Sequence, residues 1–109
     1  MRMDVRHYID ATGKDLFQRW FDSLRDPRGR IAILRRVDRL ELGNAGDHAA
    51  CRDGVWEMRI DQGPGYRVYI AKDGNAIVLL LGGGIKDSQQ RDIERAVTAW
   101  NDYKRRRCA

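Results

Sequence analysis

Cysteine and histidine are both scarce in this sequence. The 109 residues include two cysteines and two histidines. Cys51 and Cys108 form no C-x-x-C pair and no histidine cluster accompanies them, so the sequence predicts neither a zinc site nor the disulfide framework of a small secreted protein. We therefore expect no metal and no cofactor. His7 and His48 lie far apart in the chain, and we expect surface or capping roles for them rather than catalysis.

Long apolar segments are also missing. The N-terminal residues MRMDVRHYID contain no apolar core of a signal peptide, and no stretch approaches the ~20 apolar residues of a membrane span. We expect a cytoplasmic protein without a membrane partner. The length fits a single domain spanning residues 1–109, and the sequence shows no internal repeat, low-complexity segment or linker.

Positive charge is in excess. The chain has 21 Lys and Arg against 16 Asp and Glu, a formal net charge of +5 at pH 7. Such a balance on a small surface favours acidic partners, and nucleic acid is the first of these. An acidic protein partner fits the same charge equally well, and a merely solvated basic surface is the ordinary alternative.

The first half of the chain predicts one short strand and two helices. Residues 3–9 have the pattern of a strand, and Thr12 is the expected N-cap of the first helix. The Asp-Pro pair at 26–27 ends that helix, a second begins at residue 28 or 29, and the Gly-Asn pair at 43–44 ends it. The apolar stripes of the two helices are Leu16, Phe17, Trp20, Phe21 and Leu24, then Ile33, Leu34, Val37 and Leu40.

The second half changes to the period-two pattern of strands. Residues 45–54 read as a connecting loop that contains at most the first residues of a strand. Strands are expected at 55–60 and 66–70, separated by a turn, with the side chains of Trp56, Met58 and Ile60 toward the helices. Residues 76–81 are apolar throughout, which is typical of a central strand covered on both sides.

The end of the chain predicts a third helix. Three glycines, 82–84, are expected to close the last strand, because they lack both the G-K-S/T of a P-loop and the spacing of a dinucleotide fingerprint. Asp87 or Ser88 then caps a helix with Ile93, Val97 and Trp100 on its apolar stripe, followed by a basic tail at 104–107. The predicted fold is α+β, with a strand, two helices, a three-stranded antiparallel meander and a C-terminal helix, the helices being packed on one face of a small, mostly antiparallel sheet.

The alternation of the two middle strands gathers charged residues on one side. If the apolar residues of 55–60 and 66–70 face the helices, the residues between them face the other way. The two strands are hairpin neighbours, so these side chains share a patch, and Lys86 lies just past the adjoining strand at its rim. The predicted open patch consists of Glu57, Arg59, Arg67, Tyr69 and Lys86.

This patch suits the cleavage of RNA by attack of its own 2′-hydroxyl on the adjacent phosphorus. The enzyme must remove a proton from that hydroxyl, supply one to the leaving 5′-oxygen and stabilise charge on the phosphate. The arginines would bind the phosphate oxygens, Lys86 is a candidate for proton transfer, and Glu57 is a candidate base. Tyr69 or Tyr66 offers a plane on which an unstacked base can lie. The alternative is a solvated sheet face with no ligand.

Six segments carry a resemblance to a known family. They are FQRWFDSLRD (17–26), LRRVDRLELGNAGD (34–47), GVWEMRID (54–61), GPGYRVYI (63–70), LLLGGGIK (79–86) and SQQRDIERA (88–96). On these residues the chain resembles the RelE/ParE toxin superfamily, and within it the HigB-like group called addiction module killer proteins. The resemblance covers nearly the whole chain in one colinear order.

This resemblance implies a fold, partners and an activity. The family fold has one small sheet, a helical hairpin and a C-terminal helix. A cognate antitoxin, usually with a helix-turn-helix, wraps and neutralises the toxin, and operator DNA is contacted only through their complex. The RelE branch cuts mRNA on the ribosome without metal and so inhibits translation.

The resemblance also implies roles for individual residues. Arg67 matches the family's phosphate-binding arginine, and Lys86 matches the lysine or arginine that follows the last strand. Arg59 and Glu57 fall where the family often has basic residues, so Glu57 departs from the pattern. The late tyrosine of RelE has no clear counterpart here, and we expect Gln89, at the start of the last helix, to contact substrate instead.

Three functions remain open at this point. The first is a ribosome-dependent, metal-independent endoribonuclease. The second is a ParE-like inhibitor of DNA gyrase without ribonuclease activity, which the same fold can support. The third is a non-toxic module whose ligand is the antitoxin. The cluster of three basic residues favours the nuclease.

Overall fold

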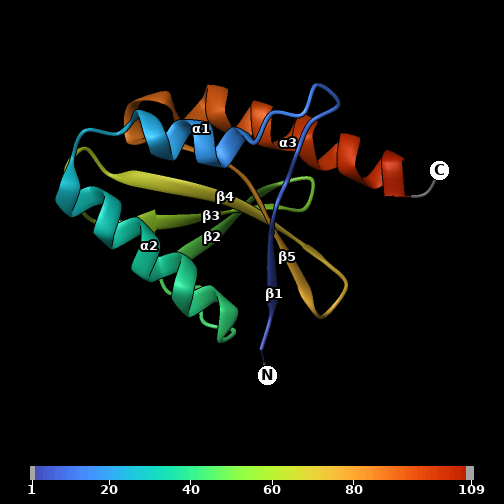
Figure 1. Cartoon of the computed structure of the whole chain (residues 1–109), viewed down its shortest axis with the longest axis horizontal. Helices are drawn as coiled ribbons and strands as arrows, with labels where there is room; N and C mark the ends of the chain where they lie inside the picture. Colours follow the sequence, from blue (N-terminus) through green and yellow to red (C-terminus); the bar gives the residue numbers. More distant parts are fainter. Residues whose placement is uncertain (1, 108–109) are drawn as a thin grey trace.

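The computed structural model describes residues 2–107, which form a mixed five-stranded sheet with three α-helices packed on it (Figure 1). No described helix is long and apolar enough to cross a membrane. Cys108 lies outside the described residues. In chain order the elements are β1 (Asp4–His7), α1 (Leu16–Ser23), α2 (Pro27–Glu41), β2 (His48–Arg52), β3 (Val55–Ile60), β4 (Tyr66–Asp73), β5 (Ile77–Ile85), the 3-10 helix η1 (Lys86–Ser88) and α3 (Gln89–Arg107).

The sheet confirms the predicted meander and adds a strand to it. The order is β1-β5-β4-β3-β2, in which β3, β4 and β5 are consecutive antiparallel neighbours and β1 runs parallel to β5. The segment expected to be mostly loop contains a full strand, β2, which pairs with β3 at the other edge. The α+β class and the order of the elements are therefore as the sequence predicts.

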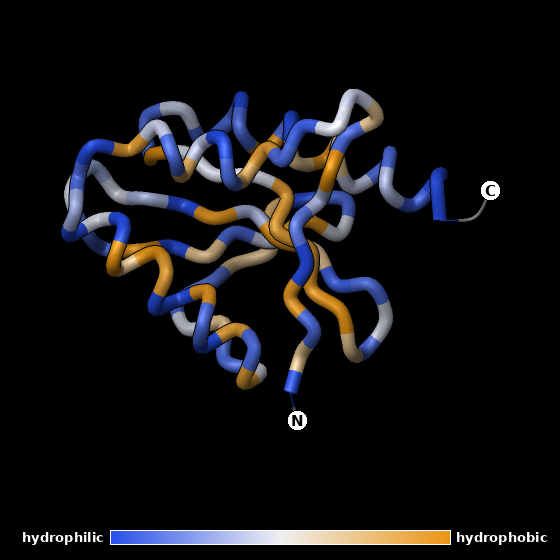
Figure 2. Tube along the Cα trace, viewed as in Figure 1, coloured by the Kyte–Doolittle hydropathy of each residue, from blue (hydrophilic) through white to orange (hydrophobic). Residues whose placement is uncertain are grey.

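The helices cover both faces of the sheet, which corrects the expectation that they share one face. The α1–α2 hairpin packs on one core, and α3 packs on a second core on the opposite face. The reason lies in β5, whose successive apolar residues alternate between the two cores, Val78 and Leu80 on one side and Leu79 and Leu81 on the other. Figure 2 shows the apolar residues concentrated along the strands and on the inner sides of the helices.

The first helix begins three residues later than predicted. Asp15, not Thr12, is its N-cap, and the Asp15 carboxylate accepts a hydrogen bond from Gln18 N at 3.0 Å. Thr12 is instead held in a turn in which its backbone N and its hydroxyl both donate to Asp10 Oδ1, at 2.8 and 2.7 Å. The break before α2 is as predicted, with Pro27 in the first turn of that helix.

The three glycines do not close the last strand, because β5 continues through Gly82, Gly83 and Gly84 to Ile85. Their small size has a packing reason. A Cβ atom on Gly83 would collide with the ring of Trp20 in α1, and one on Gly84 would collide with the carboxylate of Asp92 in α3. These glycines allow both helices to approach the same strand from opposite faces.

Two other expectations also change. Trp56 is 39% exposed rather than covered by the helices, and its ring lies 5.4 Å from that of His48. The basic residues 104–107, expected as a tail after the third helix, form the last turn of α3. Arg106 pairs there with Asp102 at 2.7 Å, and Arg107 pairs with Asp73 at the end of β4. At the other end of the helix, the Ser88 hydroxyl bonds to the backbone of Ile85.

Candidate functional site

The predicted patch residues of β3 and β4 share one face of the sheet. Glu57 lies directly opposite Tyr69, and Arg59 lies directly opposite Arg67. This register agrees with the alternation read from the sequence. The face is not open, however, because it is the one on which α3 packs. The expectation of an open patch is therefore wrong for Glu57 and Tyr69, which are buried.

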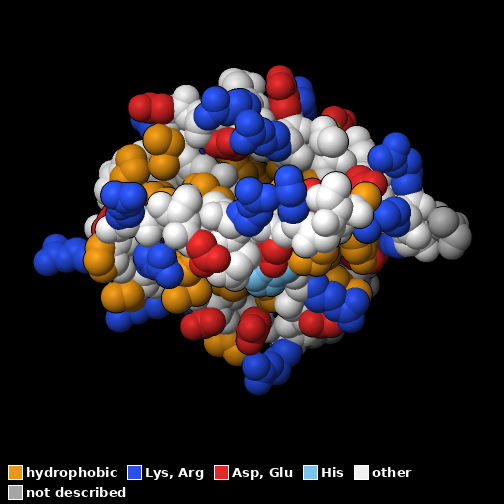
Figure 3. Space-filling view, turned by 45° about the horizontal axis from the view of Figure 1, so that its top comes forward, with side chains coloured by type: hydrophobic (Ala, Val, Ile, Leu, Met, Phe, Trp, Pro, Cys, Tyr) orange, Lys and Arg blue, Asp and Glu red, His pale blue; other side chains and the backbone are white. Residues whose placement is uncertain are grey.

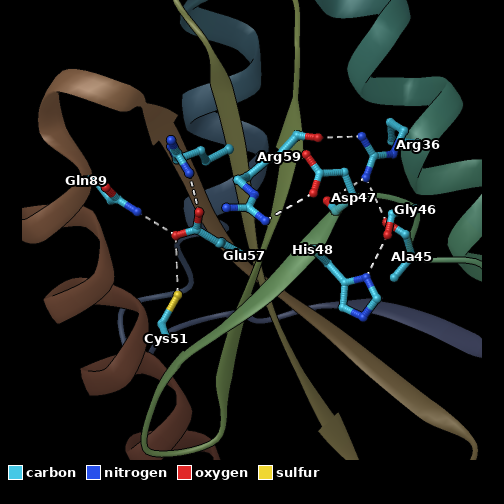
Figure 4. Close-up of polar contacts among 10 residues, drawn as sticks. Arg36, Ala45, Gly46, Asp47, His48, Cys51, Glu57, Arg59 and Gln89 are labelled. Carbon is cyan, nitrogen blue, oxygen red and sulfur yellow. Dashed lines mark hydrogen bonds and ion pairs between the residues drawn. The ribbon is translucent and has the colours of Figure 1, made fainter.

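Glu57 is the centre of a buried polar cluster, which we call the Glu57 cluster and which consists of Cys51, Glu57, Arg67 and Gln89 (Figure 4). The Arg67 guanidinium forms an ion pair with Glu57 Oε2. Gln89 Nε2, from the first residue of α3, donates to Glu57 Oε1 at 2.7 Å, and Cys51 Sγ on β2 lies 3.5 Å from the same oxygen. The Glu57 carboxylate on β3 thus contacts side chains of β2, β4 and α3 at one point.

This geometry changes the role expected of Glu57. A general base needs a lone pair within reach of the substrate hydroxyl. Both carboxylate oxygens of Glu57 already accept hydrogen bonds from protein groups, and the side chain is only 4% exposed. Glu57 therefore holds Arg67 and Gln89 in position. Gln89, expected to contact substrate, is partly buried and turned toward Glu57.

Arg59 takes a different carboxylate and remains accessible. Arg59 Nη2 contacts Asp47 Oδ1 at 3.1 Å, and the two side chains are 43% and 64% exposed. Below it, the guanidinium of Arg36 from α2 donates to the backbone oxygens of Arg59, Ala45 and Asp47, at 2.5, 2.7 and 2.9 Å (Figure 4). Arg36 thereby fixes the start of β2 against β3 and sets the position of Arg59.

Lys86 lies at the exposed rim, as predicted. It is the first residue of η1, and its backbone N donates to Gly65 O at 3.0 Å. β5 ends at Ile85, so strand alternation does not fix the direction of the Lys86 side chain. The structure places Arg59 and Arg67 on one side of the sheet and Lys86 at the turn that leads into α3.

Both candidate stacking tyrosines are buried, which corrects that assignment. Tyr66 belongs to the core under the α1–α2 hairpin and donates its hydroxyl hydrogen to Asp26 Oδ2 at 2.9 Å. Tyr69 is fully buried in the opposite core, beneath α3. Neither ring presents a face to a nucleobase. The aromatic pair that is accessible, Trp56 with His48, lies at another part of the surface.

Three polar atoms on this face are buried without a hydrogen-bond partner among residues 2–107. They are Arg59 Nε, Arg67 Nε and the Tyr69 hydroxyl oxygen. Buried donors are nearly always paired in folded proteins. Arg59 Nε and Arg67 Nε are thus buried donors, on directly opposed arginines, for which residues 2–107 offer no acceptor.

Burial also alters the acidity of two groups here. Desolvation, followed by the nearby Glu57 carboxylate, raises the pKa of Cys51 to about 11. Desolvation and the same carboxylate raise the pKa of Tyr69 strongly. Cys51 is therefore a neutral thiol at physiological pH, which does not suit a nucleophile.

The sequence indicated the charged residues on β3 and β4 but not their partners. Cys51, Asp47 and Arg36 were absent from the candidate list, because they come from the segment expected to be loop and from the polar side of a helix. Had β2 been recognised as a strand, Cys51 would have been a candidate neighbour of Glu57. Ala49 pairs with Glu57, and the ladder has a bulge between Ala50 and Arg52, where Cys51 lies. Among residues 2–107, no group of three or more His, Cys, Asp or Glu side chains is arranged to hold a metal ion.

The site has an exposed basic part, which includes Arg59, and a buried part in which Glu57 neutralises Arg67. Arginine offers bidentate hydrogen bonds to phosphate or carboxylate. The fold and site define a small α+β protein in which a buried carboxylate–guanidinium pair supports an exposed cationic edge.

The chain is 42% identical over 80 residues to an uncharacterized protein of Haemophilus influenzae, across 73% of this chain and 81% of that protein. The two belong to one family. No family model matches the chain.

Proposed function

We propose that the protein is the toxin of a type II toxin–antitoxin pair, of the RelE/ParE superfamily and its HigB-like group, and that it is a metal-independent mRNA endoribonuclease acting on the ribosome. The observed order of strands and helices is compatible with that of the superfamily. The motifs that contain Arg67 and Lys86 lie on, and directly after, the adjacent antiparallel strands β4 and β5.

The observation that carries the proposal is the pair of opposed arginines with orphaned Nε–H groups. A phosphodiester at the rim would accept hydrogen bonds from the guanidinium groups of Arg59 and Arg67, and a turn of these side chains would bring their buried Nε–H groups to it. Lys86, exposed at the start of η1, supplies a further positive charge near the rim. Three cations on one phosphate would offset the charge that develops as the 2′-oxygen attacks.

The reaction forms a bond between the 2′-oxygen and phosphorus and breaks the bond from phosphorus to the 5′-oxygen. The 2′-hydroxyl gives its proton to solvent water, the 5′-oxygen gains one from the Lys86 ammonium, which regains it from solvent, and a 2′,3′-cyclic phosphate remains. We assign phosphate binding to Arg59 and Arg67 and proton delivery to Lys86. Glu57 and Gln89 position Arg67.

A translation-coupled cleavage assay tests this proposal. Ribosomes programmed with a reporter mRNA are incubated with the protein, and new 5′ ends are mapped. Arg59→Ala and Lys86→Ala remove exposed side chains and should each slow cleavage by about 100-fold, the usual effect of losing one stabilising charge. Arg35→Ala, on the exposed side of α2, is the matched control and should cleave normally.

Arg67 needs a different substitution, because Arg67→Ala would leave Glu57 buried and uncompensated. The double variant Glu57→Gln with Arg67→Gln removes both charges and keeps the shape of the pair. It should fold and bind the antitoxin but fail to cleave. Cleavage at the wild-type rate by this variant would reject Arg67 as a phosphate ligand.

A ParE-like inhibition of DNA gyrase is the second candidate. Two observations favour it: Glu57 neutralises Arg67, and Tyr66 and Tyr69 are both buried. An inhibitor that does not cleave RNA needs neither a phosphate-binding arginine nor a tyrosine that stacks on a base. A gyrase supercoiling assay run beside the cleavage assay separates the two. Loss of supercoiling without new 5′ ends would establish the second function in place of the first.

A further inference from the structure

A small apolar pocket lies at the C-terminal end of α2, on the face of the sheet that this helix covers. Its volume is about 210 Å³, smaller than the range of about 300–1,000 Å³ typical of sites for drug-sized ligands. Leu40 of α2, Ile70 of β4 and Val78 of β5 line it, and all three belong to the core under the α1–α2 hairpin. The space suits one planar ring system rather than a larger ligand.

Trp56 of β3 lines this pocket with an accessible aromatic ring. It is 39% exposed, whereas the other Phe, Trp and Tyr rings of residues 2–107 are buried or half-buried. The imidazole of His48 on β2 also lines the pocket, and the two ring centroids lie 5.4 Å apart at an interplanar angle of 42°. Since burial of a large ring stabilises a fold, a tryptophan left exposed beside an apolar pocket indicates a contact surface.

Two polar groups at this pocket can bind a ligand. His48 Nδ1 lies 2.7 Å from Gly46 O, and because a carbonyl oxygen only accepts, Nδ1 carries the hydrogen. In the neutral ring Nε2 therefore keeps a lone pair that can accept a hydrogen bond. Lys72 of β4, exposed and directly opposite Val78, forms no ion pair with a carboxylate of residues 2–107. The pocket thus combines an aromatic plane, an acceptor and a cationic donor.

Positive charge by itself does not locate a nucleic-acid site on this protein. Figure 3 shows Lys and Arg side chains spread over one face of the molecule, with Asp and Glu side chains between them. Such charges contact phosphates wherever they lie, whereas a base needs a plane and a polar edge. The exposed ring beside an apolar pocket is therefore the more informative feature.

The edge of the sheet at β2 connects this pocket with the side on which Arg59 lies. β2 is an edge strand, His48 is its first residue, and Asp47 immediately precedes it. Asp47 pairs with Arg59 at 3.1 Å, whereas His48 lies opposite Met58, which belongs to the core on the other face. Figure 4 shows the His48 ring directed away from the Arg59–Asp47 pair. An extended chain can thus pass around this edge from Arg59 to Trp56 without crossing another strand.

We propose that the pocket lined by Trp56, His48 and Lys72 binds an unstacked nucleobase of a single-stranded RNA whose phosphate backbone is held at Arg59. The base stacks on Trp56, and its polar edge faces His48 and Lys72. The inference rests on the proposed function for the choice of RNA as ligand, and it adds a base-binding subsite to that function.

A nucleobase fits this pocket better than an aromatic side chain of a partner protein does. A base has a flat π face and an edge that carries both donors and acceptors. It can therefore donate to His48 Nε2 and accept from Lys72 while it stacks on Trp56. A phenylalanine ring would use the plane alone and would leave both polar groups without a partner. The net charge of +5 also favours a polyanionic chain.

Calorimetric titration with four probes tests the proposal. They are an eight-nucleotide 2′-O-methyl oligouridine, which lacks the attacking hydroxyl, the same oligomer with abasic sugars, uridine 5′-monophosphate, and an eight-residue peptide of alternating phenylalanine and glutamate. The oligouridine should bind at least about five-fold more tightly than the abasic oligomer, the lower end of what one stacked base contributes, and the other two probes should bind more weakly than the oligouridine.

Three results would overturn the proposal. Equal affinity for the two oligomers, including an absence of binding by both, would exclude a contribution from the base. Tighter binding of the peptide would assign the pocket to an aromatic side chain of a protein. Binding of the mononucleotide as tight as that of the oligouridine would assign it to a free nucleotide and would reject the link to Arg59.

Matched variants test the position of the base. Trp56→Ala should abolish the preference for the oligouridine over the abasic oligomer, and Trp56→Phe, which keeps an aromatic plane, should retain it in part. Ile31→Ala removes an exposed apolar side chain of α2 outside the pocket lining and should bind as the wild type does. Lys72→Ala should weaken oligouridine binding more than Lys14→Ala, which removes the same charge from another exposed site. An unchanged preference in Trp56→Ala would reject the pocket, and equal losses in the two lysine variants would reject the contact with Lys72.

Tryptophan fluorescence separates this proposal from the proposed function. Trp56 is the exposed tryptophan of the three, so the oligouridine should quench the emission of the wild type but not that of Trp56→Phe. An absence of quenching in the wild type would contradict stacking on Trp56. If the proposed function alone were wrong, the ribosomal assay would yield no new 5′ ends, while the preference for the oligouridine and its loss in Trp56→Ala would persist.

Discussion

Removing Glu57 should destabilise the protein far more than removing Asp47. Both carboxylates pair with arginines on the same face, and the two arginines are direct cross-strand neighbours. The environments differ, because the Arg67–Glu57 side chains are 12% and 4% exposed and the Arg59–Asp47 side chains are 43% and 64% exposed. Removing one partner of a buried pair costs about 3–5 kcal/mol, and an exposed pair contributes about 0.2–1 kcal/mol.

Urea denaturation measures this difference. With a slope of about 2 kcal/mol/M, Glu57→Ala should lower the unfolding midpoint by about 1.5–2.5 M and Asp47→Ala by at most about 0.5 M. Glu57→Gln with Arg67→Gln should recover much of the loss, since no unpaired buried charge remains. The slope itself should stay constant among the variants. A Glu57→Ala variant as stable as Asp47→Ala would refute the view that the buried Glu57 carboxylate stabilises the fold through Arg67 and Gln89.

Three further predictions concern packing and pH. Gly83→Ala should lower the free energy of unfolding by about 1–3 kcal/mol, because its methyl group would collide with the Trp20 ring. The control Gly74→Ala meets no atom within 4 Å and should show only the cost of a positive φ for alanine. With Cys108→Ser as background, Cys51 should react with iodoacetamide at pH 8 about 100-fold more slowly in the folded than in the unfolded protein, because its pKa is about 11 rather than 9.0; equal rates would contradict its burial. Stability should fall as pH rises from about 9 to 11, because the unfolded chain releases the Cys51 proton while the folded chain retains it, and the slope should be shallower in Cys51→Ala.

Local patterns predicted most of the secondary structure because each depends on neighbouring residues. The alternation in 55–60 and 66–70 and the apolar stripes of the three helices all correspond to observed elements. The hairpin register follows from the same alternation, so the pairing of Arg59 with Arg67 was also predictable. Sequence spacing did not predict where α3 would pack, since that depends on which face of β5 remains uncovered.

The errors at the site arise from contacts between distant segments. Glu57 was expected in the open, but Gln89, 32 residues further along the chain, covers it and bonds to it. Tyr69 points to the face of the sheet that the alternation predicts. The alternation does not reveal, however, that α3 covers this face and buries the side chain. The glycine run was expected to close the last strand, whereas β5 continues through it and the absent side chains let Trp20 and Asp92 approach the strand.

The unequal lengths of β1 and β5 have a consequence for other members of the family. A first strand of four residues beside a last strand of nine leaves the second half of β5 without a neighbour on one side. A homologue whose first strand ran four residues further would pair with this half of β5 and leave no free edge beside the glycines. The number of residues between the first strand and the first helix therefore indicates which relatives keep this edge unpaired.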